Sequence, residues 1–509
     1  MVTTQALTEL YQKKLSSTDG GSPLDHAVNA FVENKTPDYA ALKQFIISMK
    51  EDNSPLEHLQ KWRNVLALNL LIDLTGSQAF YQTMAVDLVK KLSQKIFWLE
   101  FQPLNALIGL NCYLTGLPRR PISTKQLASG AATLECGDHY PWADIPVPIF
   151  HAELGVLWAV LGKMTGDHEL VLAAIQLADW QLNTLDHNYD PFLGLFTQEG
   201  DSSPVELLGY NYLLFHMVAA ISDRPEMEYV AEKQLEFLRA CSEASSGTIT
   251  PLMVLLDRWM DKMFPPVKSN YEPQKSAIYD PHTALVGHRS TTNDLVCTLF
   301  GGHTGLGCYR LKDVEIMSYG PQSLPLGDCS GFGIERGVSR MSKGVSDIVM
   351  NSNEKGFSIS GRAKLASQVS KKESFALFRN GKSSNVWMES KQHFDGTVLH
   401  INASFLGLRS SDQIAFVFFI KAQSCLLNDQ RQINPRSLDR YEGILQQVTF
   451  QSEQSAIKIK ANYPNGQMQL IPLSGQDSFW GSDFLLAYLI DTKELHYGWE
   501  IDSTPTQLN

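Results

Sequence analysis

The stretch FPPVKSNYEPQKS, residues 264–276, separates two parts of the chain whose hydrophobic patterns differ. Before it, apolar residues recur every three or four positions, as in Leu42, Phe45 and Met49, which is the period of an amphipathic helix. After it, short runs rich in Val, Ile and Phe alternate with polar residues, which is the period of a β-strand. The prolines and polar residues of the stretch itself are typical of a linker between domains.

The first part, residues 1–265, predicts roughly ten to twelve helices. Its breaks fall at Gly or Pro beside residues that cap helices well, as at Thr165-Gly166-Asp167 and Asp223-Arg224-Pro225. The helices expected at 151–164 and 168–182 are apolar around most of their circumference, so each must be covered on more than one side. This requirement favours a closed or layered helical array over a simple bundle.

The second part predicts an antiparallel β-sandwich over residues 281–509, after a linker at 266–280. No regular helix is expected between its strands, which argues against the parallel sheets of α/β folds. The dipeptides Asn380-Gly381, Asp395-Gly396 and Asn465-Gly466 each favour a tight hairpin. The expected strands are 295–300, 314–319, 356–361, 374–379, 398–405, 414–420, 445–450 and 456–461.

The composition is that of an ordinary folded chain, with 43% hydrophobic and 19% charged residues. At 509 residues the chain exceeds what one core usually serves, so two large or three smaller domains are expected. A net charge of −11 without a long basic tract argues against nucleic acid as the main partner. The seven cysteines include no C-x-x-C pair, so we expect neither a disulfide framework nor a thiolate zinc site. We also expect no cofactor.

Targeting signals are not evident in the sequence. The N-terminal segment lacks the basic and apolar regions of a signal peptide. The longest apolar stretches, such as Ile414 to Ile420, are far short of the ~20 residues that span a bilayer, so no membrane partner is expected. We therefore expect a cytoplasmic protein by default, or a periplasmic or secreted one if a leader was removed. The oligomeric state is not indicated.

The segment GLFTQEGDSSPVELLGYNYLLFH, residues 194–216, and the order of the two parts together resemble a known family. They resemble the polysaccharide lyases of the heparinase II/III and alginate lyase type, which are built from an (α/α) toroid of helical hairpins followed by a β-sandwich. In those enzymes a Gly-Phe turn precedes a Glu, a Ser-Pro and a helix that carries Tyr and His, and Ser203-Pro204 is kept here. The chain departs from the family where Val205-Glu206-Leu207 replaces the usual Tyr-His step. The His-x-His-x-Asp strand entry of the family is also missing from the β part.

The resemblance implies a lyase that cleaves uronate-containing polysaccharides or oligosaccharides by β-elimination, with a glycan as its partner. Such elimination needs a neutraliser for the carboxylate, a base and an acid, roles that Tyr, His, Asn and Arg can fill without a metal. Two alternatives stay open. One is a glycoside hydrolase that uses paired carboxylates on the same helical toroid. The other is a non-catalytic protein that binds a glycan or a protein through a degenerate cleft.

The first candidate catalytic residues are Tyr212 and His216. They are four residues apart and are expected on one helical face, so both can point into a single cleft. Tyr212 is the predicted proton shuttle, and His216 is the predicted base or neutraliser, with Tyr210 and Asn211 beside them binding substrate. Tyr212→Phe is then expected to abolish turnover and leave folding intact. The alternative is that both rings pack between helices with satisfied polar groups.

A second set of candidates lies in DHYPWAD, residues 138–144, and at His151. The stretch has the composition of a long interhelical loop, and such loops often carry function. Tyr140 is the second choice for the proton shuttle and His151 for the base, while Trp142 and Asp144 are candidates for stacking and hydrogen bonding to a sugar. The alternative is a connector shaped by its prolines, with Trp142 as a plug.

Further candidates are charged residues. Glu199, Asp201 and Asp144 are candidate substrate-binding carboxylates, and they are also the acids that the hydrolase alternative would use, although helix caps and solvated loops explain such residues equally well. In the β part, Arg289 and His303 are expected to supply a cation and a donor to an anionic sugar. For Arg289, the alternative is a surface ion pair. The run Gly301 to Gly307 lacks the Lys-Ser/Thr of a phosphate loop and predicts a turn.

Overall fold

The computed structural model describes most of the chain. The described residues are 6–17, 21–48, 55–76, 79–94, 102–119, 127–128, 131–132, 147–195, 204–244, 249–265, 267–268, 277–281, 283–299, 305–323, 341–353, 355–366, 383–410, 414–428, 431–437, 440–462, 467–473, 479–491, 494 and 496–504. The chain divides into two compact units. The helical unit comprises Met1–Tyr140, Ile149–Leu182 and Ser203–Gln274, and the β unit comprises Pro141–Pro148, Asn183–Ser202 and Lys275–Asn509.

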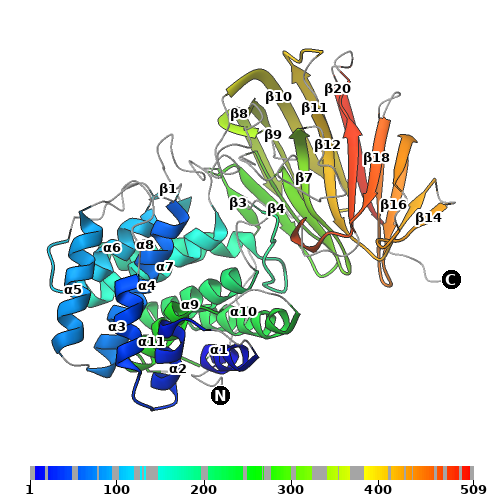
Figure 1. The fold of residues 1–509 in the computed structure, drawn as a ribbon. Coiled ribbons are helices and arrows are strands. Elements are labelled where there is room, and N and C mark those ends of the chain that lie inside the picture. The colour runs from blue at the N-terminus through cyan, green and yellow to red at the C-terminus, as the bar shows by residue number, and fades with distance from the viewer. Residues whose placement is uncertain are drawn as a thin grey trace. The chain divides into compact units, whose positions relative to one another are not determined.

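The helical unit is built from α-helices that pack in pairs (Figure 1). Consecutive helices contact one another, as α2 with α3, α4 with α5, α8 with α9 and α9 with α10, and α4 also contacts α6 and α11. The helices within the described residues are α1 (Ala6–Ser17), α2 (Pro23–Val32), α3 (Tyr39–Ser48), α4 (Pro55–Thr75), α5 (Ala79–Ser93), α6 (Gln102–Leu114), α7 (Pro148–Thr165), α8 (His168–Gln181), α9 (Pro204–Ser222), α10 (Pro225–Ala244) and α11 (Pro251–Met263). A short hairpin, β1 (Leu127–Ala128) and β2 (Ala131–Ala132), accompanies them.

Local sequence explains where several of these helices begin. Ser22 and Asp25 form a reciprocal capping box at the start of α2, and Asp167 and Thr250 cap α8 and α11 through their side chains. By length and composition α9 would be long enough to cross a membrane, but 72% of its apolar window is buried inside the protein. The breadth of its apolar surface is therefore that of a core helix, as the sequence predicts for its neighbours α7 and α8.

The β unit contains two nine-stranded sheets in which every pair of neighbouring strands is antiparallel. The β12 sheet has the order β15-β18-β19-β12-β7-β6-β5-β4-β3, and the β10 sheet has the order β14-β13-β16-β17-β20-β11-β10-β9-β8. Side chains from both sheets form one continuous core, so the sheets pack face to face as a sandwich. A second, smaller cluster lies around Phe419 and Leu485.

The strands, drawn from green to red in Figure 1, have the following bounds. They are β3 (Ile278–Asp280), β4 (Leu285–Arg289), β5 (Asp294–Thr298), β6 (Gly307–Leu311), β7 (Val314–Ser323), β8 (Met341–Asn353), β9 (Gly356–Ala366), β10 (Ser383–Phe394), β11 (Val398–Leu406), β12 (Ile414–Lys421), β13 (Ser424–Leu427), β14 (Arg431–Ile433), β15 (Tyr441–Ile444), β16 (Gln447–Gln451), β17 (Ala456–Ala461), β18 (Gln467–Pro472), β19 (Phe484–Leu489) and β20 (His496–Thr504).

The predicted fold class, helical hairpins followed by an antiparallel β-sandwich, is confirmed. Each predicted strand except 374–379, which lies outside the described residues, overlaps an observed strand. Asp395-Gly396 joins β10 to β11, with Gly396 at a φ of +104° that favours glycine. The other two hairpin dipeptides lie outside the described residues.

The division of the chain is less simple than two consecutive domains. The last three residues of the expected linker form β3, which pairs with β4. Residues 183–202, which follow α8 and were expected to be part of the helical domain, belong to the β unit. Asp186, His187 and Asp190 lie in this segment.

Candidate functional site

A single carboxylate organises the loop between Leu185 and Pro191. Oδ1 of Asp186 accepts hydrogen bonds from the backbone N–H groups of Asn188, at 2.7 Å, and Asp190, at 2.9 Å. The backbone N–H of Asp186 in turn donates to the Asp190 carbonyl at 2.9 Å. Short acidic side chains commonly hold turns in this way. The loop therefore has a fixed backbone that can hold a reactive side chain in place.

Arg310 in β6 attaches this loop to the β12 sheet. Its guanidinium donates to Asp186 Oδ2 at 2.7 Å and to Asp190 Oδ2 at 3.0 Å. It also donates to Glu315 Oε1 at 2.8 Å and lies 5.3 Å from the centroid of the Phe192 ring. Burial alone would lower the pKa of Arg310, but Glu315, Asp190 and Asp186 raise it well above its ordinary value. Arg310 therefore stays charged and ties the loop to the strands.

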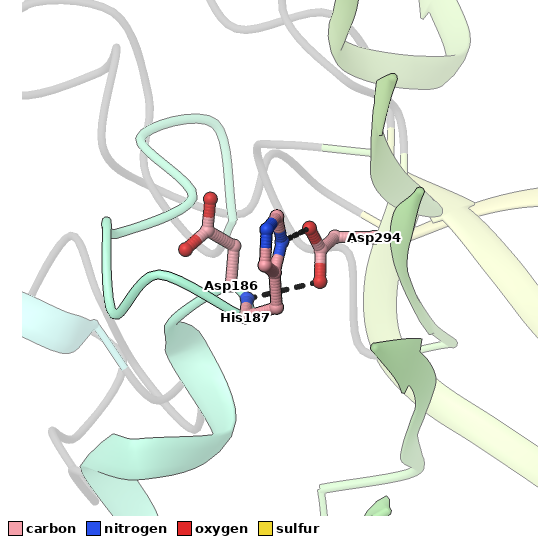
Figure 2. Close-up of side chains that lie close together, drawn as sticks. All are labelled: Asp186, His187 and Asp294. Carbon is pink, nitrogen blue, oxygen red and sulfur yellow. Dashed lines mark hydrogen bonds and ion pairs between the residues drawn. The ribbon is translucent and has the colours of Figure 1, made fainter. Parts of the chain in front are cut away.

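His187 and Asp294 form a histidine–carboxylate pair (Figure 2). The backbone N–H of His187 donates to Asp294 Oδ1 at 2.9 Å, and Nδ1 of the ring is hydrogen-bonded to Oδ2. Asp294 is the first residue of β5 and its side chain is 1% exposed, whereas that of His187 is 20% exposed. A carboxylate at Nδ1 fixes the tautomer and the orientation of an imidazole, which leaves Nε2 as the basic nitrogen. The pair therefore provides an oriented and partly exposed base.

Arg289, a residue that the sequence predicts for the site, lies in β4 directly opposite Asp294 in β5. Its Nε donates to the Leu185 carbonyl at 2.8 Å. Burial lowers the pKa of Arg289 to about 10, although Asp294, Asp186 and Tyr189 favour its charged form. Arg289 is therefore a cation at neutral pH, and it lies next to the carboxylate that orients His187. We refer to Asp186, His187, Arg289, Asp294 and Arg310 together as the loop site.

Two carboxyl groups near Arg310 have pKa values close to neutrality. Burial raises the pKa of Asp294 to about 6, and Asp186 adds to the increase while the hydrogen bonds from His187 oppose it. Burial also raises the pKa of Asp190 to about 6, against the effect of Arg310. Shifts of this kind cluster at functional sites, and ion-pair networks produce them as well. The ion pairs of Arg310 and His187 show such a network here.

Three members of the loop site have donor atoms placed close enough to hold a metal ion. Asp186, His187 and Asp294 each offer one ligand atom, and these atoms lie within 4.8 Å of one another (Figure 2). Imidazole and carboxylate are suitable ligands for a divalent cation. Both carboxylates already have partners, because Asp186 accepts from Arg310 and Asp294 is bound by His187. The contacts therefore fit an ion-paired cluster in which Arg310 supplies the positive charge.

The helical unit brings Tyr212 and His216 together on one face of α9, as the sequence predicts, with ring centroids 5.5 Å apart. Tyr212 is 3% exposed, and its hydroxyl donates to Asp257 Oδ1 at 3.2 Å. Nδ1 of His216 is hydrogen-bonded to Glu228 Oε2 at 2.6 Å. Burial raises the pKa of Asp257 to about 7. The Tyr212 hydroxyl and Nδ1 of His216 are thus bound inside the unit, and the catalytic roles of both residues stay predictions.

Tyr210 belongs to a separate cluster around Glu153, which is fully buried. Arg63 donates to both oxygens of Glu153, at 2.7 and 2.6 Å, and the Tyr210 hydroxyl donates to the same carboxylate at 3.3 Å. Glu206 lies four residues before Tyr210 on α9, and burial raises its pKa while Arg63 lowers it. The ion pair joins α4 to α7, and the hydrogen bond from Tyr210 joins α9 to them.

Asn211 and His151 also lie in the interior of the helical unit. Asn211 is fully buried, accepts a hydrogen bond from Gln181 at 2.9 Å and donates one to Gln234 at 3.0 Å. His151 is fully buried, and its ring centroid is 4.3 Å from that of Trp180. Of the predicted site residues, Tyr140, Trp142, Asp144, Glu199, Asp201 and His303 lie outside the described residues.

Comparison with solved structures finds similarity to polysaccharide lyases over nearly the whole chain. The chondroitin AC lyase of Streptomyces coelicolor, in complex with chondroitin sulphate, is 9% identical, with 99% of this chain and 75% of that chain covered and a TM-score of 0.49. A heparinase III is 8% identical, with 98% of this chain and 75% of that chain covered and a TM-score of 0.46. The heparan sulfate lyase HepC of Pedobacter heparinus is 8% identical over 99% and 73%, with a TM-score of 0.43. No protein-family model and no curated protein matches the sequence.

Sequence reasoning missed His187 and Asp294, although it selected Arg289 beside them. The two residues are 107 positions apart and come from different elements, so no local spacing connects them. A compositional signal was present in LDHNYDP, residues 185–191, which has the same mixture of Asp, His, Tyr and Pro as the stretch DHYPWAD. Such a mixture is typical of a shaped, polar loop and could have drawn attention to both stretches equally.

Proposed function

We propose that the protein is a lyase that cleaves uronate-containing polysaccharides or oligosaccharides by β-elimination. The observation that carries the proposal is the His187–Asp294 pair beside Arg289. The loop site thereby combines an oriented base with a cation. These are the two groups that proton removal next to a carboxylate requires first.

In the proposed reaction the uronate carboxylate lies against Arg289, whose charge makes the proton on C5 more acidic. Nε2 of His187 takes this proton, the electron pair left on C5 forms the C4=C5 double bond, and the bond from C4 to O4 breaks. The imidazolium then returns the proton to the departing O4. Asp294 stabilises the imidazolium between the two steps, as a carboxylate does in other His-dependent enzymes.

The helical unit offers Tyr212 and His216 as a second set of groups for the same roles. The Tyr212 hydroxyl is bound to Asp257 and almost fully buried, and Nδ1 of His216 is bound to Glu228. The proposal assigns proton transfer to His187, which is partly exposed and lies beside Arg289 in the same unit. The Tyr212 and His216 assignment is the alternative within the same reaction class.

The reaction class is tested by incubating the purified protein with a panel of uronate-containing and neutral glycans. New reducing ends and the ultraviolet absorbance of an unsaturated uronide are followed together. Elimination is expected to give both signals, and only on uronate-containing glycans. Reducing ends without the chromophore would establish a glycoside hydrolase, and neither signal would favour a binding protein; both results contradict the proposal.

The role of the loop site is tested by His187→Gln. The variant keeps a polar side chain but removes the base, so turnover is expected to fall about 10²–10⁴-fold. His168→Gln, at an exposed position at the start of α8, is the matched control and should keep the activity of the unchanged protein. Full activity in a folded His187→Gln variant would exclude His187 as the base.

A further inference from the structure

The outer face of the β10 sheet carries an aromatic side chain between two cations. Trp387 in β10 lies opposite Lys364 in β9 and Leu406 in β11. The Lys364 Nζ is 5.6 Å from the centroid of the Trp387 ring, and Cζ of Arg362 is 6.0 Å from it. Successive side chains of a strand point to opposite faces of the sheet. Because Val386 and Met388, on either side of Trp387, are buried in the core, Trp387 lies on the outward face.

The same face continues with polar groups along β10. Glu389 lies opposite Arg362 and pairs with it at 2.9 Å, and Lys391 lies opposite Asn402. Both Glu389 and Lys391 are exposed. Four residues of a strand span roughly 14 Å, so Lys391 lies about that far along β10 from Trp387. We define the Trp387 face as Arg362, Lys364, Trp387, Lys391 and Leu406.

This arrangement fits a sugar chain that carries negative charges. The flat ring of Trp387 and the neighbouring Leu406, which is 37% exposed, offer apolar surface for the C–H face of a sugar ring. Lys364 beside the ring holds it in place and can also bind a carboxylate or sulfate group, whereas Arg362 is paired with Glu389. Glu389 and Asp347 pair with Arg362, at 2.9 and 4.0 Å, so the positive charge of the face comes from Lys364 and Lys391.

We propose that the Trp387 face is a binding site for an anionic polysaccharide, separate from the loop site. It holds one strand of polymer by stacking on Trp387 and by ion pairs with Lys364 and Lys391. The class of ligand rests on the proposed function, whereas the site rests on its own contacts. A nucleic acid is the less favoured polyanion, because a chain with a net charge of −11 and no long basic tract is poorly suited to follow a phosphate backbone.

The test is affinity electrophoresis of the full-length protein in native gels. The gels contain heparin, polygalacturonate, dextran or single-stranded DNA, and the protein carries His187→Gln so that a lyase would not degrade the polymer during the run. Heparin or polygalacturonate should retard the protein, and dextran should not. The two anionic polymers separate recognition of sulfate from recognition of carboxylate.

Trp387→Ala is expected to weaken this retardation about tenfold in apparent Kd. Lys364→Gln should weaken it less and reduce its dependence on salt. Lys458→Gln is the matched control, because Lys458 lies on the same side of the same sheet in β17, four strands from β9, and it should leave binding unchanged.

Three results would overturn the proposal: no retardation by either anionic glycan, equal losses in Lys364→Gln and Lys458→Gln, or retardation by DNA alone. Failure of the proposed lyase function has a different signature, since a protein without elimination activity can still be retarded through Trp387. Conversely, Trp387→Ala should leave cleavage of short oligosaccharides intact if the loop site acts alone in catalysis.

Discussion

Tyr212 has a hydroxyl, a group that can transfer a proton, and this hydroxyl takes part in a hydrogen bond that stabilises the helical unit. Its ring stacks on His216, yet its hydroxyl turns to Asp257 on α11, while His216 turns to Glu228 on α10. A buried carboxyl that loses its donor bears the cost of its own desolvation. The hydrogen bond from Tyr212 therefore stabilises the helical unit whether or not the hydroxyl also moves a proton.

Tyr212→Phe is accordingly expected to lower the free energy of unfolding by about 1–3 kcal/mol, as measured by urea denaturation. Tyr113→Phe is the matched control, since the Tyr113 hydroxyl donates to the Met164 carbonyl at an exposed position and its loss should cost less. Turnover of folded Tyr212→Phe, on a glycan that the unchanged protein cleaves, then decides its role. Retained turnover excludes Tyr212 as the proton shuttle.

The sequence predicts the proximity of Tyr212 and His216 because residues four apart on a helix share a face. It does not predict their partners, which come from helices further along the chain. The same limit applies to His187 and Asp294, whose contact depends on how a loop docks against β5. Residue types and local spacing therefore predict which side chains share a helix face. The hydrogen-bond partner of each polar group depends on tertiary packing and is not predicted.

At the scale of elements, α9, α10 and α11 together bury His216, Glu228 and Asp257, and the pKa values of His216 and Asp257 are raised there. Burial raises the pKa of Asp257 to about 7, with His216 opposing and Asp261 adding to the increase. Burial alone would lower the pKa of His216, but Glu228, Asp257 and Asp261 raise it. Both shifts make the folded state bind protons more tightly than the unfolded chain, so the network favours folding at acidic pH.

The free energy of unfolding is therefore expected to fall as the pH rises. The contribution of Asp257 is complete below its unfolded pKa of 3.8 and is lost as the pH passes about 7, and that of His216 is lost as the pH rises through its raised folded pKa. Between pH 5 and pH 8, Asp257→Asn should flatten this decline by about 3 kcal/mol at most, since the rest of the change lies below pH 5. Urea denaturation over this pH range measures it.

Asp87→Asn, which removes an exposed carboxyl of α5, is the control for this experiment and should follow the unchanged protein at every pH. A slope in Asp257→Asn equal to that of the unchanged protein would show that the carboxyl titrates at its ordinary pKa. The elements themselves were predictable because their periods are local. The proton preference was not, because three helices must meet to bury Asp257.

For the whole molecule, the chain does not pass from one unit to the other only once. It leaves the helical unit after α8, contributes residues 183–202 to the β unit, and returns to begin α9. No change of period marks this excursion, since a loop of thirteen described residues has no period to change. The segment belongs to the β unit because Arg310 and Arg289 bind it from strands more than 100 residues further along the chain.

Arg310→Gln should therefore loosen residues 185–191 together with β5 and β6, although α8 and α9 flank the loop in sequence. The substitution leaves Asp186, Asp190 and Glu315 without their shared cation, a loss worth about 3 kcal/mol for a buried network. Hydrogen exchange of the full-length protein should show faster exchange in 185–191 and in the β unit, with α8 and α9 unchanged.

Arg224→Gln, which removes a more exposed cation from its pairs with Asp179 and Glu226, is the control and should affect only the helix ends that these pairs join. Faster exchange that spread through α8 and α9 instead would mean that the loop is held by the helices beside it.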